Sequence, residues 1–290
     1  MNLHRERLKY ITAVVLYGTI GLFLRRVDLP SELVAMCRGS IGSLFIFGYL
    51  KLTGRNPDLP AIKKNLKWLV LSGICLGLNW IFLFAAYIKT TVAIASLCNY
   101  LAPIIVVLIS PLVLHEKLEV RKLPCVAAAF IGIILVSGIT GGSLGDPAGI
   151  ILGLLAALGF VGIVLCNRKL ENISAYDRSI VQLLVSAVTI LPYFLIHNRG
   201  ITLTFNTESI LIILLLAIVH TGVAYCLYFS GMVTLPVQTV AVLGYLEPVV
   251  SVLTSVFILN EPLSLYGWIG ALMVIAAAAV SEISFSSETK

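Results

Sequence analysis

Charged residues are scarce in this chain of 290 residues, since Asp, Glu, Lys and Arg together make up only 12% of it. A soluble domain carries about a quarter. So few charges cannot cover the surface of a globular protein that is 59% hydrophobic. The composition therefore excludes a soluble globular protein, and it also excludes a disordered or fibrous chain. Lipid is the solvent expected around most residues, and the mean hydropathy of +1.02 agrees with this.

Motifs for metal binding, nucleotide hydrolysis and lipid chemistry are missing as well. The six cysteines lie in apolar stretches without a Cys-x-x-Cys pair, so we expect small buried side chains, no metal site and no cofactor. The absence of a Gly-x-x-x-x-Gly-Lys-Ser/Thr loop argues against ATP as the energy source. An intramembrane lipid-modifying enzyme is the rival class. Its usual His-Glu-x-x-His or paired-carboxylate motifs are not found, so we do not expect an enzyme.

Ten apolar runs follow one another, separated by short polar segments. They predict an all-α integral membrane protein with ten transmembrane helices over residues 8–24, 33–50, 66–88, 92–114, 124–140, 148–166, 179–196, 209–230, 237–259 and 265–280. Arg25 and Arg26 follow the first run where small residues would mark a cleavage site, so we take that run as a retained helix. No loop is long enough to fold alone, and function must reside between the helices.

The basic residues indicate the orientation in the membrane. With the N-terminus inside, fifteen of the 20 Lys and Arg residues fall on the cytoplasmic side, and only Arg25, Arg26, Lys89 and Arg199 fall outside. Arg38 lies within a span. The net charge of +6 thus marks topology in a multi-pass protein of the cytoplasmic membrane with both termini inside, and it does not indicate a nucleic-acid partner.

An internal repeat relates the two halves of the chain. At an offset of 145 residues the fourth span aligns without gaps on the ninth, with ten of 27 positions identical between 92–118 and 237–263. The matches include Pro103 with Pro248 and Glu116 with Glu261. Each copy, 1–140 and 147–290, holds five spans. Because five is odd, the copies are expected to be inverted, the arrangement in which transporters place a substrate site at the midplane.

Two five-span copies, each with a mid-span Pro followed thirteen residues later by Glu, resemble the EamA-type branch of the drug/metabolite transporter superfamily. The Leu-Glu-Pro-Val beginning at Leu246 and the Leu-Asn-Glu-Pro-Leu beginning at Leu259 carry the likeness. It implies a permease or exporter whose central cavity is lined chiefly by spans 1, 3, 4, 6, 8 and 9. It also implies efflux or transport of amino acids, related metabolites or amphipathic drugs.

The expected function is therefore secondary transport by alternating access, with a small-molecule substrate, a lipid bilayer as surroundings and a monomer as the working unit. Import of an organic cation such as a quaternary amine is the alternative within transport. A channel or sensor is a third possibility, weakened by the absence of a signalling domain. Export is favoured by the resemblance alone.

Three ionisable side chains inside the spans are candidates for charge pairing or proton coupling. Glu247 lies near the middle of its span, where an ionised carboxylate needs water, a cation or a partner. Either it faces the cavity in one polar stripe with Ser251 and Thr254, or it is a structural, hydrogen-bonded Glu. Arg38 either extends to the outer interface or pairs with Glu247 or a substrate carboxylate. His220 either carries a proton or packs as a hydrogen-bonded histidine, the simpler interpretation.

Aromatic and amide side chains form the second group of candidates. Aromatic rings can enclose a ring or an organic cation, although for any single one a lipid-facing position is the competing interpretation. Pro103 and Pro248 are expected to kink their helices, with packing favoured over ligand contact. The expected substrate contacts are Asn79, Trp80, Tyr87, Asn99, Tyr100, Tyr225, Tyr228, Tyr245 and Glu247, with Tyr17 a further ring on the first span.

Overall fold

The computed structural model describes residues 3–113, 123–136, 146–199, 203, 205–235, 243–244 and 246–286, and it is helical throughout, without a strand in these residues. The helices are α1 (Leu3–Gly18), α2 (Ile20–Leu24), α3 (Ser31–Leu52), α4 (Leu59–Lys89), α5 (Val92–Asn99), α6 (Ala102–Val113), α7 (Leu123–Val136), α8 (Pro147–Asn167), α9 (Ala175–His197), α10 (Thr207–Leu214), η3 (Leu215–Val223), α11 (Ala224–Thr234), α13 (Leu246–Phe257) and α14 (Leu265–Ser286).

Every one of the ten predicted runs overlaps a helix. Six helical stretches in the described residues are long and apolar enough to cross a membrane, and four shorter apolar helices cover the remaining runs. The all-α class and the multi-pass character are confirmed. Ten crossings and an inverted relation between the halves stay predictions. The third run starts earlier than predicted, because the Asp58 side chain accepts a hydrogen bond from the Ala61 amide and begins α4 at Leu59.

The fourth predicted span is two helices rather than one. α5 ends at Asn99 and α6 begins at Ala102. The cause is Pro103, which has no N–H to donate to the Asn99 carbonyl and whose ring would clash with that carbonyl in a continuous helix. The Leu101 amide instead bonds the Cys98 carbonyl at 3.2 Å, in a tighter turn. The expected kink at this proline is therefore a complete break, although its ring lies outside the described side chains.

The second proline of the pair lies differently from the prediction. α13 begins at Leu246, which places Pro248 in its first turn rather than in the middle of a helix. In a first turn the missing N–H leaves no hydrogen bond unmade. Glu247 is the second residue of the same turn, where the positive end of the helix dipole favours a carboxylate.

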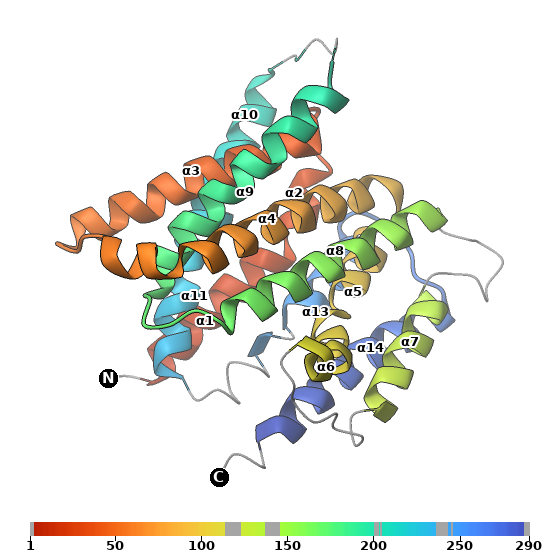
Figure 1. The fold of residues 1–290 in the computed structure, drawn as a ribbon. Helices are drawn as coiled ribbons and strands as arrows, with labels where there is room; N and C mark the ends of the chain where they lie inside the picture. Colours follow the sequence, from red (N-terminus) through yellow and green to blue (C-terminus); the bar gives the residue numbers. More distant parts are fainter. Residues whose placement is uncertain are drawn as a thin grey trace.

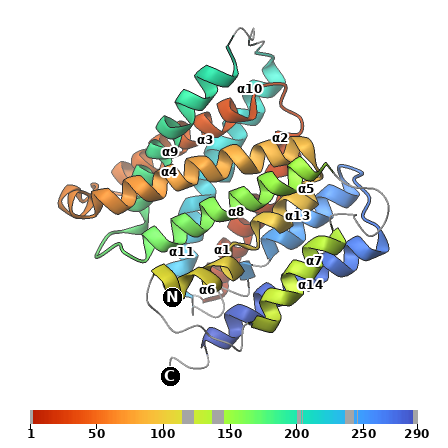
Figure 2. The ribbon, with the colours of Figure 1, turned by 45° about the vertical axis from the view of Figure 1, so that its right-hand side comes forward.

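Packing brings the two halves of the chain into direct contact. α4 packs along α8 and α9, α3 along α9 and η3, and α1 along α11 and α13. Figures 1 and 2 show α4 and α8 running side by side through the bundle, and α7 paired with α14 at its edge. Gly73 and Gly77 of α4 are close-packing positions, since a Cβ on either would meet the backbone or side chains of α9.

Gly18 allows α1 to approach α13 beside Glu247. A Cβ at this position would lie 2.7 Å from the Glu247 carbonyl oxygen and 2.7 Å from the Val250 Cβ. We therefore expect Gly18→Ala to lower the free energy of unfolding by about 1–3 kcal/mol, because the backbones must separate.

Gly48 on α3 is the matched control for this prediction, since a Cβ there meets no heavy atom within 4 Å. Gly48→Ala should leave stability unchanged or raise it through helix propensity. Thermal unfolding in detergent measures both variants. Equal melting temperatures for the two would contradict the close approach of α1 to α13.

Candidate functional site

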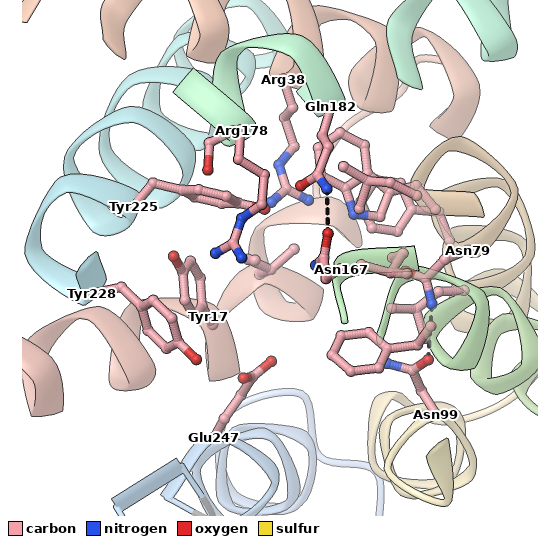
Figure 3. Close-up of a pocket in the computed structure, with 18 of the residues that line it drawn as sticks. Tyr17, Arg38, Asn79, Asn99, Asn167, Arg178, Gln182, Tyr225, Tyr228 and Glu247 are labelled. Atoms are coloured by element: carbon pink, nitrogen blue, oxygen red, sulfur yellow. Dashed lines mark hydrogen bonds between the residues drawn. The ribbon is translucent and has the colours of Figure 1, made fainter. Parts of the chain in front are cut away.

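A cavity of about 300 Å³ lies between the halves of the chain. Residues from α1, α3, α4, α5, α8, α9, α11 and α13 contribute to its wall. Most of these helices belong to the spans that the family resemblance implies. α3 and α9, from the second and seventh spans, are additional, and they contribute both arginines of the site. Figure 3 shows these side chains converging on one space.

Arg38 is 3% exposed, and its guanidinium faces the cavity. The extended, interface-seeking conformation considered from the sequence is therefore not observed. Its Nε donates to the Thr221 hydroxyl at 3.1 Å, and the guanidinium carbon lies 4.7 Å from the centre of the Trp80 ring and 5.4 Å from that of Phe84. Two ring faces and one hydroxyl thus fix the guanidinium, which leaves its other N–H groups toward the cavity.

The π-helical segment η3 supplies the hydroxyl that holds Arg38. The Thr221 hydroxyl donates to the Leu216 carbonyl, five residues earlier, at 2.9 Å, and accepts the bond from Arg38. Single turns of π-helix in α-helices occur often at functional sites. Nothing in the apolar pattern of this span distinguishes a π-helix from an α-helix, so the sequence did not predict it.

Arg178 lines the cavity but was not among the site residues predicted from the sequence. It was assigned to a cytoplasmic loop, but α9 begins at Ala175, capped by the Ser174 hydroxyl on the Asp177 amide, and this brings Arg178 into the helix. Its guanidinium extends into the cavity, 5.6 Å from the centre of the Phe229 ring. A Ser three residues before an Asp is a capping pattern that could have revealed this earlier helix start.

Glu247 enters the same cavity from α13, opposite the two arginines (Figure 3). Within the described parts of the chain no carboxylate lies within the 4.0 Å of an ion pair from Arg38 or Arg178, so the considered Arg38–Glu247 pair is not formed. The cavity therefore presents two guanidinium groups and one carboxylate whose charges are not cancelled by direct pairing.

Neutral amides line the wall between the charged groups. Asn79 donates to the Asn99 side chain at 3.0 Å and to the Ala156 carbonyl at 2.8 Å, which joins α4, α5 and α8. Gln182 donates to Ser72 at 2.7 Å and to Asn167 at 2.6 Å, which joins α9 to α4 and α8. These bonds fix the wall by joining one helix to another.

The aromatic side chains of the cavity pack against one another, so part of their ring surface is not available to a substrate. Trp80 stacks on Phe84 at 6.2 Å, and Phe84 on Tyr87 at 6.2 Å. The Tyr17 ring lies 5.9 Å from both Tyr225 and Tyr228. Trp80 faces the Arg38 guanidinium and also lines the cavity. It can therefore hold the guanidinium in place, contact a substrate, or do both.

The other predicted site residues lie away from the cavity or outside the described chain. His220 is 2% exposed and does not line the cavity; its Nε2 lies 3.1 Å from the Thr19 hydroxyl and its ring 5.0 Å from Phe23. These are the contacts of a packing histidine. Tyr245 and Glu116 fall outside the described residues.

Glu247 lines the cavity, but Ser251 and Thr254 of the same polar stripe do not, contrary to one of the two interpretations considered from the sequence. The Ser251 hydroxyl lies 2.6 Å from the Ser96 hydroxyl, which lies 3.2 Å from that of Tyr87. Ser251 and Thr254 are buried. The stripe is a seam that joins α13 to α5, because small hydroxyls let the two helices approach and bond.

A charged cluster stands at the end of this seam, where α4 ends. Arg25 Nη2 lies 2.7 Å from Glu261 Oε1 and donates to the Thr90 carbonyl at 2.6 Å. The other oxygen of Glu261 accepts from the Val92 amide at 2.9 Å and from the Ser255 hydroxyl at 2.6 Å. Glu261 therefore caps α5, and the cluster joins residues of the first half to residues of the second.

Comparison with known protein families identifies the kind of protein that contains this cavity. The model of the EamA-like transporter family matches residues 8–138 and again residues 147–282. The chain belongs to this family. Members of the EamA-like family are described as transporters, so the protein is a multi-pass membrane protein of a transporter family rather than an enzyme.

Individual proteins similar to this EamA-like chain support the family assignment. An uncharacterized transporter, YxxF, of Bacillus subtilis is 29% identical over 94% of this chain and 88% of its own length. Protein PecM of Dickeya dadantii is 27% identical over 84% of this chain and 82% of its own. A crystal structure that is 21% identical covers 96% of this chain and 98% of its own with a TM-score of 0.67, and it supports the fold alone.

Proposed function

We propose that this EamA-like protein is a secondary transporter that moves small amino-acid-like metabolites across the cytoplasmic membrane by alternating access. The observation that carries the proposal is one cavity with guanidinium groups on one side and a carboxylate on the other. An amino acid has the complementary pair, because its carboxylate matches a guanidinium and its ammonium matches Glu247. Fixed charges of both signs favour a zwitterion over a neutral drug.

Alternating access requires that one end of the cavity is closed while the other is open. We infer that the Arg25–Glu261 cluster and the seam of Ser96 and Ser251 form the closed end. By the predicted topology this end faces outward, and the cavity reaches Asn167 and Arg178 at the cytoplasmic ends of α8 and α9. Two inverted halves would exchange this state for its opposite. The family resemblance favours export, and we expect a monomer to be the working unit.

Proton coupling, where it occurs, would use Glu247 rather than His220. Glu247 lines the cavity, whereas His220 is outside its lining and is buried against Thr19. A carboxylate that alternates between a proton and a substrate ammonium links the two fluxes, because the same lone pairs bind either one.

Counterflow in proteoliposomes tests the proposal. Vesicles loaded with an unlabelled amino acid should accumulate the labelled one transiently and saturably, and excess unlabelled substrate outside should compete. A carrier gives this overshoot and a channel does not. Accumulation of quaternary amines with no amino-acid exchange would replace the proposal by the organic-cation alternative, which Glu247 and the tyrosines favour and the two arginines oppose.

A further inference from the structure

The charges that line the cavity do not balance. Its ionisable lining in the described chain, apart from tyrosines, consists of Arg38, Arg178 and Glu247. With all three ionised the formal charge is +1. A neutral amino acid brings one carboxylate and one ammonium, and it would leave one guanidinium in a low-dielectric space without an anion. Such an uncompensated charge is unfavourable unless a ligand supplies the counter-charge.

The two guanidinium groups are held separately, so each has its own place for an anion. Arg38 comes from α3 and is fixed by Thr221 and the Trp80 ring. Arg178 comes from the first turn of α9 and lies over Phe229. Figure 3 shows both directed into one space, with Glu247 approaching from the opposite side. The wall thus offers two positions for acidic groups and one for an ammonium.

We propose that the preferred substrates carry two acidic groups and one ammonium, and so a net charge of −1. One acidic group binds each guanidinium, in the forked geometry that suits arginine and carboxylate, and the ammonium binds Glu247. The inference rests on the proposed transport function and narrows its substrate class. The cavity of about 300 Å³ admits a compound of this size.

The test compares acidic amino acids with their amides, which are nearly identical in shape. Proteoliposomes of the full chain are assayed for counterflow of L-glutamate and L-aspartate against L-glutamine and L-asparagine. Glutarate serves as the probe that lacks the ammonium. We expect kcat/KM for the acids to exceed that for the amides at least about tenfold, as the loss of one charged hydrogen bond predicts, and glutarate to compete weakly.

Arg178→Gln is the decisive variant, because it removes one positive charge from the cavity. It should bring the acid-to-amide ratio of kcat/KM close to one, because the second acidic group loses its guanidinium partner. Lys169→Gln is the matched control, since Lys169 is an exposed cation in the neighbouring loop outside the cavity lining. The control should keep the wild-type ratio, which separates a local charge from a general surface potential.

The outcomes distinguish this inference from the function on which it rests. Equal or better exchange of L-glutamine, with a ratio unchanged in Arg178→Gln, would overturn the acidic substrate class and leave amino-acid transport standing. Exchange of none of the four amino acids by a folded, vesicle-inserted protein would overturn both.

Discussion

Glu247→Gln is expected to lower counterflow of a substrate with an ammonium group by about ten- to hundredfold without unfolding the protein. Glutamine has the shape of glutamate, but it has no charge for the ammonium. A hydrogen bond to a charged group contributes about 1.5–3 kcal/mol, and each 1.4 kcal/mol is about a tenfold change in affinity. The loss should appear in kcat/KM for uptake into proteoliposomes.

The matched control for this substitution is Glu208→Gln. Glu208 is an exposed glutamate in the first turn of α10 and does not line the cavity. It should transport at the wild-type rate. Melting temperatures of both variants check that the fold is kept. Wild-type transport by a folded Glu247→Gln protein would remove this carboxylate from the site and reduce it to a structural group.

Arg25→Gln is expected to shift the protein toward the state in which the opposite end of the cavity is closed. The substitution breaks the 2.7 Å ion pair with Glu261 and the bond to the Thr90 carbonyl. For a pair that is partly exposed we expect a change of about 1–2 kcal/mol, which corresponds to a five- to thirtyfold change in the ratio of the two states. A shift of this size in the ratio of the two ligand-free states slows the step in which the empty transporter returns to its starting state.

The measurement uses a single reporter cysteine at Leu83, a residue of the cavity wall, in a background without the six native cysteines. A membrane-impermeant thiol reagent added from the outer side should label this cysteine several-fold faster in Arg25→Gln. Arg26→Gln is the control, because Arg26 is an exposed neighbour outside the cluster. Equal labelling rates in the two variants would show that the cluster does not close the cavity.

Much of the helix order could be read from the sequence, because a membrane requires long apolar helices with satisfied backbones. The breaks in those helices were harder to predict. A proline at position 103 was correctly taken as a disturbance, but whether it bends or ends a helix depends on which neighbouring groups donate to the freed carbonyl. The π-helical turn at Thr221 has no apolar period of its own, so periodicity could not predict it.

The candidate site was predictable where a side chain is unusual for its depth in the membrane. Glu247 and Arg38 stand out as charges within apolar runs, and both line the cavity. Arg178 did not stand out, because it lies at the edge of its run, where a basic residue is expected to mark the cytoplasmic side. Its role follows only from the direction of its side chain, which packing against Phe229 determines.

The polar stripe of α13 also could not be interpreted from the sequence alone, because its packing partner was not known. The spacing of Glu247, Ser251 and Thr254 predicts that they share a helix face, but it does not say what that face contacts. In the structure the face meets the cavity at Glu247 and helix α5 at Ser251. A sequence pattern defines the face, and only the packing partner decides whether a hydroxyl binds a substrate or another helix.

Substrate protection of the cavity is the most direct test of the central claim that this space holds the transported molecule. The Leu83→Cys reporter, in the background free of native cysteines, is labelled with and without the compound that gives the strongest counterflow. Ile88→Cys, an exposed position on the same helix outside the cavity lining, serves as the control. We expect the compound to slow labelling at position 83, at concentrations near its KM, and to leave labelling at position 88 unaffected. Equal labelling at position 83 with and without a saturating substrate would contradict it.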